Sequence, residues 1–232
     1  MQKNTIMAIS ENLSKIKSEL PSNVKLIAVS KTKPETDIIE AYNTGHKIFG
    51  ENKVQELVDK YQHLPKDIEW HFIGHLQTNK VKYIAPFVNL IHAVDSLKLL
   101  KEINKQAIKN NRIIDCLLQF HIADEEAKFG FLKNEVINLL QSDDFQKLTN
   151  IRILGVMGMA TYTDDENQIH SEFAKLKSYF EEIKEKYMTQ NYFSEISMGM
   201  SADYNIAIEE GSTMIRLGSS IFGIRFYSGL KM

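Results

Sequence analysis

Eight short apolar runs recur along the chain, and segments with a helical pattern separate several of them. The runs are nearly continuous in apolar residues, as is typical of parallel strands that are buried on both faces. Strands that alternate with helices favour a parallel sheet covered by helices. The runs occupy residues 24–30, 46–52, 69–75, 88–96, 113–122, 151–160, 193–201 and 213–223.

The helical segments are recognised by apolar residues at three- or four-residue steps and by residues that can cap a helix. The steps from Ile6 to Leu20 predict an amphipathic helix at the N-terminus. Ser96 can cap one of the internal helices, and Thr163 or Asp164 can cap the longest of them. The predicted helices cover residues 1–20, 35–45, 96–111 and 165–188.

Eight strands within 232 residues predict an α/β fold. The fold expected is a single (β/α)₈ TIM barrel with an extra N-terminal helix. A doubly wound open sheet is the alternative, but no G-x-G-x-x-G fingerprint follows the first strand. With 4 prolines and no linker-like segment, residues 1–232 are expected to form one domain.

The charge balance and the cysteine content restrict the partners and the compartment. A net charge of -2 provides no field that would favour nucleic acid or an acidic membrane. Charged residues interrupt the N-terminal segment, so we expect neither a signal peptide nor a membrane span. The single cysteine, Cys116, lies in an apolar run and is expected to be structural, which fits a cytoplasmic protein.

Lys31 follows the first predicted strand, in the segment "LIAVSKTKP". Because side chains alternate along a strand, Lys31 shares a face with Val29 and Ile27, while Ser30 lies on the other face. If Val29 and Ile27 fill the barrel, Lys31 points into its mouth, where catalytic and binding residues of this fold gather. Lys33 lies beyond the strand and is expected on the rim.

Small residues end the last two strands, in "SMGMSADYN" and "RLGSSIFG". Ser201, Gly218 and Ser219 are candidates for a phosphate site, which recurs after strands seven and eight of such barrels. A lysine opposite bound phosphate suggests pyridoxal 5'-phosphate, whose aldehyde condenses with an amine. Arg216 is placed to face the pyridine nitrogen of that cofactor.

Five segments together resemble the pyridoxal phosphate homeostasis protein family. They are "AVSKTKP", "FGENKVQEL", "WHFIGHLQTNK", "SMGMSADY" and "GSTMIRLGSSIFG", and they run in order over nearly the whole chain. The resemblance implies a barrel similar to the N-terminal domain of alanine racemase.

The resemblance also assigns roles to individual residues. It implies that Lys31 forms the Schiff base and that Lys33 is a second lysine near the site. It implies a position for Asn52 near the ring, for Arg216 at the ring nitrogen, and for the phosphate at Ser201, Gly218 and Ser219. Some positions depart from the common pattern: Lys53 stands in place of tyrosine, His75 in place of proline, Ser219 in place of threonine and Ala202 in place of a frequent acidic residue.

The expected function is to hold the cofactor within the cell with little or no catalysis. A guanidinium does not accept a proton, so Arg216 favours an unprotonated ring nitrogen and a weak electron sink. A monomer is expected, with the cofactor and apo-enzymes that receive it as partners, and without nucleic acid or membrane. A small amino-acid racemase is the first alternative, and a barrel in which Lys31 only pairs with a phosphate ligand is the second.

His71 and His75 can be placed on one face of a strand, which raises the question of a metal site. No third ligand stands at a motif spacing, so we expect no metal.

Overall fold

A computed structural model describes residues 8–124 and 129–223 of the chain. Its eight strands form a closed barrel in sequence order, and every neighbouring pair is parallel. Pairing of β8 with β1 closes the barrel, so the predicted (β/α)₈ fold is confirmed. The strands are β1 (Lys25–Val29), β2 (Ile48–Glu51), β3 (Glu69–Phe72), β4 (Leu90–Val94), β5 (Ile114–Gln119), β6 (Ile151–Met157), β7 (Glu195–Ser197) and β8 (Met214–Leu217).

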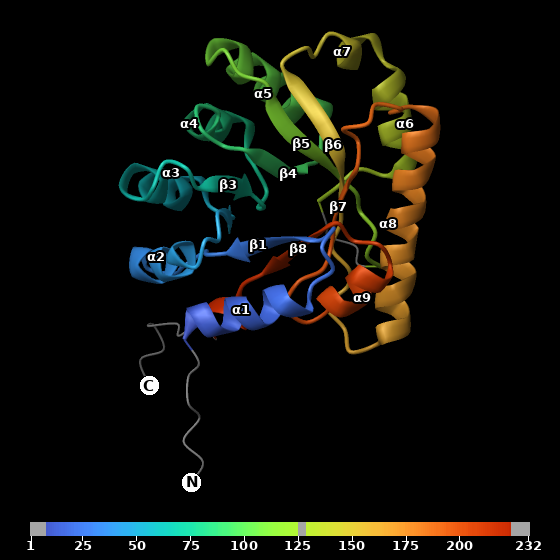
Figure 1. The fold of residues 1–232 in the computed structure, drawn as a ribbon. Helices are drawn as coiled ribbons and strands as arrows, with labels where there is room; N and C mark the ends of the chain where they lie inside the picture. The colour runs from blue at the N-terminus through green and yellow to red at the C-terminus, as the bar shows by residue number, and fades with distance from the viewer. Residues whose placement is uncertain (1–7, 125–128, 224–232) are drawn as a thin grey trace, which may run out of the picture.

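Helices surround the barrel, and α8 is the longest of those described (Figure 1). They are α1 (Ile9–Glu19), α2 (Glu35–Asn43), α3 (Val54–His63), α4 (Val81–Ile84), α5 (Leu97–Lys109), α6 (Lys133–Gln141), α7 (Asp143–Gln146), α8 (Glu166–Lys186), α9 (Tyr204–Glu209) and α10 (Ser219–Phe222), with a 3₁₀ turn at Thr78–Lys80.

The caps of two predicted helices can be checked directly. The Ser96 hydroxyl accepts a hydrogen bond from Leu99 N, so the predicted cap of α5 is confirmed. The prediction for α8 was wrong by one or two residues, because the Asp165 carboxylate accepts from the amides of Asn167 and Gln168. The run at 213–223 contains both β8 and the short helix α10, and these two meet at Gly218, one of the small residues that were expected to end the eighth strand.

The extra N-terminal helix takes part in the ring around the barrel. Helix α1 packs against α2 and α10, and Asn12 Nδ2 donates to the carbonyl of Ile221 over 3.0 Å. Leu13 and Ile16 are the buried residues of its apolar face, whereas Ile6 lies outside the described residues. Helix α1 therefore covers a part of the barrel wall that the four-residue α10 is too short to cover.

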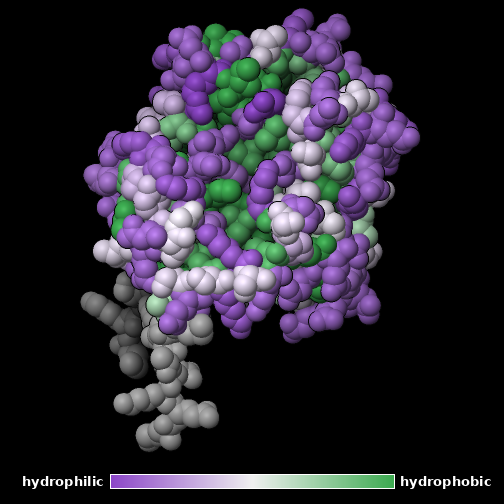
Figure 2. All heavy atoms as spheres, in the orientation of Figure 1, coloured by the Kyte–Doolittle hydropathy of each residue, from purple (hydrophilic) through white to green (hydrophobic). Residues whose placement is uncertain are grey.

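The alternation along β1 separates two hydrophobic cores. Ile27 belongs to a small cluster inside the barrel with Leu90, Leu117 and Met214, while Ala28 belongs to the large core between the sheet and the helices. Figure 2 shows that hydrophilic residues dominate the outer surface and that apolar residues gather in the middle of the face in view. In the described part of the chain, no helix is both long and apolar enough to cross a bilayer.

Candidate functional site

A cavity of about 720 Å³ opens at the carboxyl ends of the strands. This volume lies in the range of small-molecule sites, on the order of 300–1,000 Å³. Residues from the ends of β1, β2, β7 and β8 meet there. The lining includes each of the six predicted site residues: Lys31, Asn52, Ser201, Arg216, Gly218 and Ser219.

Lys31 sits in a tight turn directly after β1. The carbonyl of Ser30 accepts from Lys33 N over 3.0 Å, which closes the turn. Val29 and Lys31 both line the cavity, while Ser30 is fully buried on the opposite side. The predicted sharing of a face by Val29 and Lys31 is therefore confirmed.

Lys33 does not line the cavity. Its ammonium donates to the carbonyls of Phe222 and Gly223, over 2.7 and 3.3 Å. These two carbonyls lie at the end of α10, where a cation is favourable because the last carbonyls of a helix lack internal partners. Lys33 thus ties the turn after β1 to the segment that follows β8.

Asn52 reaches the cavity from the end of β2, close to Gly74 after β3. A Cβ atom added to Gly74 would lie 2.4 Å from the Asn52 carbonyl oxygen and 2.9 Å from its Cβ. Only glycine permits this approach. Lys53, which stands where tyrosine is common, precedes α3.

Ser201 and Gly218 come together from the ends of β7 and β8. The amide of Gly218 donates to Ser201 Oγ over 3.3 Å. A Cβ at Gly218 would lie 3.3 Å from the carbonyl oxygen of Val29, so a side chain there would crowd β1. Ser219 is exposed at the start of α10. Hydroxyl and amide donors are thus grouped on the side of the cavity formed by the last two strands.

Arg216 is the buried cation of the site, with 4% of its surface exposed. Its Nη1 donates to Ser197 Oγ over 2.6 Å, and its Nη2 donates to the carbonyl of Gly158 over 3.2 Å. Burial lowers the pKa of the guanidinium to about 10, although the charge of Asp203 acts in the opposite direction. Within the described residues Arg216 has no carboxylate within ion-pair distance, so its hydrogen-bond acceptors are neutral.

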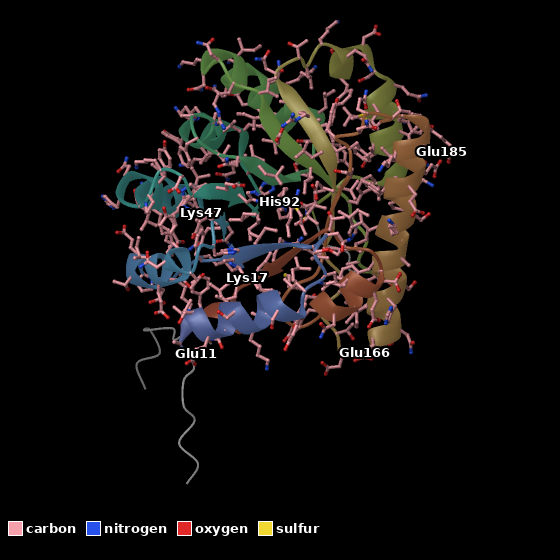
Figure 3. The ribbon with its side chains drawn as sticks, viewed as in Figure 1. Glu11, Lys17, Lys47, His92, Glu166 and Glu185 are labelled. Atoms are coloured by element: carbon pink, nitrogen blue, oxygen red, sulfur yellow. The ribbon has the colours of Figure 1, made fainter. Side chains whose placement is uncertain are left out.

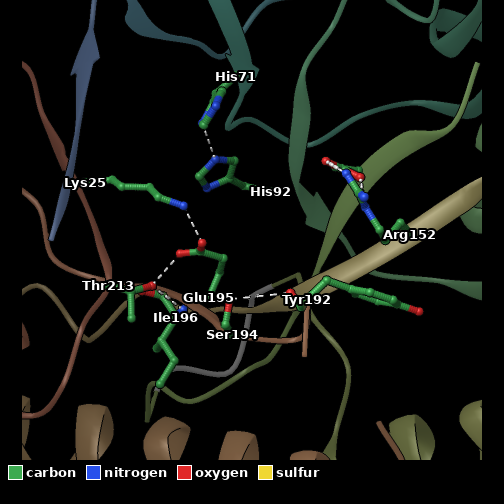
Figure 4. A network of polar contacts seen from close by, with 10 residues as sticks. Lys25, His71, His92, Arg152, Tyr192, Ser194, Glu195, Ile196 and Thr213 are labelled. Atoms are coloured by element: carbon green, nitrogen blue, oxygen red, sulfur yellow. Dashed lines mark hydrogen bonds and ion pairs between the residues drawn. The ribbon is translucent and has the colours of Figure 1, made fainter. Parts of the chain in front are cut away.

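Two histidines extend this hydrogen-bond network from Arg216 and Ser197 into the barrel. The network was not predicted from the sequence. His92 Nδ1 lies 2.9 Å from Ser197 Oγ, and His92 Nε2 lies 3.0 Å from His71 Nδ1. Burial holds the pKa of His71 at about 3 and that of His92 well below its ordinary value, so both rings are neutral. Figure 3 shows His92 in the interior of the barrel, and Figure 4 shows its contact with His71.

The direction of one hydrogen bond in this network is fixed by its donor. Arg216 can only donate, so Ser197 Oγ accepts from it. The directions of the two contacts of His92 follow from the tautomers of the imidazoles. Nearby in the barrel, the Glu195 carboxylate accepts hydrogen bonds from the Lys25 ammonium and from the Thr213 hydroxyl (Figure 4).

The two histidines that raised the question of a metal lie in different surroundings. His71 is buried against His92, whereas His75 follows the end of β3, stacks on Phe129 and contacts Asp95 over 3.0 Å. Over residues 8–124 and 129–223, no group of three or more acidic, His or Cys side chains could hold a metal ion. Cys116 is buried, and burial raises the pKa of its thiol well above the ordinary value.

Apolar side chains complete the cavity. Met157, Met159 and Met200 line it together with Phe129 and Tyr162, and Tyr162 is 91% exposed at the rim. Neither of the two aromatic residues was predicted as part of the site.

Comparison with known proteins identifies the family. The family described as "Alanine racemase, N-terminal domain" matches residues 5–226. A pyridoxal phosphate homeostasis protein of Aquifex aeolicus is 42% identical over 205 residues, 88% of this chain and 88% of the relative. Another, of Pasteurella multocida, is 37% identical over 235 residues, 96% of this chain and all of the relative.

The chain belongs to the pyridoxal phosphate homeostasis protein family. The resemblance drawn from its motifs is therefore confirmed.

A solved member of related sequence is PipY of Synechococcus elongatus. Its structure with PLP bound is 35% identical, has a TM-score of 0.82, and matches over 93% of this chain and all of that chain. Its structure without PLP has a TM-score of 0.87. PipY thus shares the barrel described above.

Proposed function

We propose that this chain binds pyridoxal 5'-phosphate in the cavity at the mouth of the barrel and takes part in pyridoxal phosphate homeostasis. Lys31 attaches to the cofactor through a Schiff base, and Ser201, Gly218 and Ser219 receive the phosphate. The observation that carries the proposal is the meeting of these residues with Arg216 in one cavity. The names of the family members and the solved PipY structure with PLP bound support it.

The donors present fit the charge and shape of this cofactor. Gly218 lacks a side chain beside Val29, so a phosphate oxygen can approach its backbone closely. The hydroxyls of Ser201 and Ser219 add donors for the same group. Asn52 and the methionines provide a polar edge and an apolar surface for a flat ring. When bound, the cofactor would supply an aldehyde for the amine of Lys31 and a ring that can accept electron density.

Arg216 favours holding the cofactor over carbanion chemistry. A ring nitrogen that faces a guanidinium stays unprotonated, because the guanidinium donates its hydrogen bonds and accepts none. An unprotonated ring withdraws electrons weakly, which disfavours removal of an α-proton from an amino acid. The proposed protein therefore stores the cofactor in a protected form and has little or no catalytic activity.

We infer that the protein works in the cytoplasm as a monomeric single domain and yields the cofactor to apo-enzymes that depend on it. A buried thiol, Cys116, and a small net charge are compatible with that compartment. Sedimentation analysis of the purified protein tests the monomer.

The holding function is tested by two measurements on the same purified protein. Titration with pyridoxal 5'-phosphate should produce an absorbing Schiff base, and incubation with amino acids in D₂O should give little exchange at the α-carbon. Transfer of the cofactor to an apo-enzyme faster than its spontaneous release would support delivery. Rapid α-carbon exchange would instead favour the racemase.

A further inference from the structure

The backbone beside Lys31 adopts an unusual conformation. Thr32 has a φ of +66°, in the left-handed region. Residues 30–33 form a turn in which glycine is the usual occupant of this position, and a β-branched residue is disfavoured there. Such a residue persists only where its surroundings hold it, and such positions concentrate at functional sites.

Glu56 holds the amide of this residue. The Thr32 N–H donates to Glu56 Oε1 over 2.6 Å. Glu56 lies in the first turn of α3, so one contact joins the strained residue to a helix that packs on the barrel. An amide bonded to a carboxylate has a stronger hydrogen bond than one bonded to a neutral acceptor.

Lys60 connects the other side of Lys31 to the same helix. Its ammonium is buried and donates to the carbonyl of Ser30, to Glu51 Oε1 and to Glu56 Oε1, over 2.8, 2.8 and 2.7 Å. The Ser30 hydroxyl also donates to Glu51 Oε1 over 2.6 Å. Glu51, Glu56 and Lys60 therefore make one network that grips the residue before Lys31 and the residue after it.

The position of this network is informative. It lies behind the strand, on the side of β1 opposite the cavity, because Ser30 points away from the face that Val29 and Lys31 share. A buried ion pair is often no more stabilising than apolar residues of similar size. Two carboxyl groups and an ammonium directed at one turn are therefore poorly explained by stability, and well explained by a need to fix that turn.

We propose that Glu56 and Lys60 are positioning residues that fix the turn around Lys31, so that its amine is aimed at the aldehyde of the bound cofactor. The inference rests on the proposed function, and it adds a requirement outside the cavity. Neither residue lines the cavity, so their loss should impair covalent attachment and leave non-covalent binding of the cofactor's phosphate and ring intact.

Two ligands separate covalent attachment from non-covalent binding. Pyridoxal 5'-phosphate carries the aldehyde, whereas pyridoxine 5'-phosphate keeps the ring and the phosphate but cannot condense with an amine. The dissociation constant for pyridoxine 5'-phosphate divided by that for pyridoxal 5'-phosphate reports how much the covalent step adds to binding. Lys31→Ala sets the value of that ratio when no Schiff base can form on Lys31.

Glu56→Ala is the main variant, because Glu56 is only partly buried and its removal leaves no buried carboxylate unpaired. We expect the affinity for pyridoxal 5'-phosphate to fall about tenfold, the effect of losing one hydrogen bond to a charged group. The affinity for pyridoxine 5'-phosphate should change less than twofold. Glu56→Gln retains an acceptor for Thr32 N and should restore most of the loss. Asp59→Ala removes an exposed carboxylate from the same helix and is the matched control.

Lys60 requires a paired change, since Lys60→Met alone would leave Glu51 buried with its charge unpaired. The double variant of Lys60→Met with Glu51→Gln leaves no such charge. It should weaken binding of pyridoxal 5'-phosphate more than binding of pyridoxine 5'-phosphate, as Glu56→Ala does. Equal weakening of both ligands in these variants would overturn the inference, as would no change in either. If wild type and Lys31→Ala gave the same ratio, the proposed attachment at Lys31 would itself be wrong.

Discussion

Arg216 Nη1 lies 2.6 Å from Ser197 Oγ, and this contact joins the cavity to the interior of the barrel. Through Ser197, the buried guanidinium is linked to His92 and His71, two imidazoles that remain neutral because of burial. The cavity is therefore connected to a hydrogen-bond network inside the barrel, and the acceptors that hold Arg216 are neutral groups in place of a carboxylate.

Ser197→Ala should destabilise the protein, because it removes an acceptor from a buried cation and the hydrogen-bond partner of His92. The loss of unfolding free energy should be about 1–3 kcal/mol. Chemical denaturation measures it. Ser18→Ala, which changes an exposed hydroxyl, should alter stability little. A Ser197→Ala protein as stable as wild type would mean that this contact contributes nothing.

Lys33→Met should leave covalent attachment at Lys31 possible but should weaken binding of the cofactor. The Lys33 ammonium holds two carbonyls at the end of α10, the helix that begins beside Gly218. Loss of these contacts should reduce affinity by about tenfold, on the order of one hydrogen bond to a charged group. Absorbance titration gives the affinity. Disappearance of the Schiff base in this variant would show that Lys33 carries the cofactor.

Gly74→Ala should displace Asn52 from the cavity. The added methyl group would lie 2.4 Å from the Asn52 carbonyl oxygen, which is shorter than a van der Waals contact. We expect a stability loss of about 1–3 kcal/mol from overpacking and weaker binding of pyridoxine 5'-phosphate. Asn52→Ala provides the comparison, because it removes the side chain without moving the backbone. Unchanged binding in both variants would exclude Asn52 from the site.

Stability should fall as the pH is lowered from about 6.5, the ordinary pKa of histidine. Burial lowers the pKa of His46 to about 4 in the folded protein. Between these two pH values the unfolded chain binds more protons than the folded one, so acid favours unfolding. His46 can contribute up to about 1.4 kcal/mol of destabilisation for each pH unit in this range. His71, whose pKa is about 3, acts in the same direction.

Thermal unfolding at pH 7 and pH 5 measures this effect. His46→Gln should reduce the difference between the two conditions, because it removes a group that must take up a proton on unfolding. A His46→Gln protein with the same pH dependence as wild type would contradict the assignment.

Much of the barrel could be predicted from the sequence, and the reason is physical. Eight apolar runs identify eight strands because both faces of each strand are buried, and alternation along β1 placed Val29 and Lys31 on one face. The predicted ends of the helices and strands were less accurate. In residues 213–223 apolar residues stand on both sides of Gly218, so composition could not distinguish β8 from the short helix that follows it.

The supporting contacts of the site could not be predicted in this way. Glu51, Glu56 and Lys60 look like ordinary charged residues in the sequence. Only the pairing of β2 with β1 and the packing of α3 bring them to the turn that holds Lys31. His92 stands in the apolar run 88–96, and its polar side chain between Ile91 and Ala93 was the available signal. Its link to Ser197 spans 105 positions of the chain and depends on closure of the barrel.

The most direct measurement is to reduce the protein with borohydride in the presence of pyridoxal 5'-phosphate, digest it and sequence the labelled peptide by mass spectrometry. We predict one cofactor-sized addition on Lys31, and its loss in Lys31→Ala. Labelling at another lysine, or no addition to the wild-type protein, would contradict it.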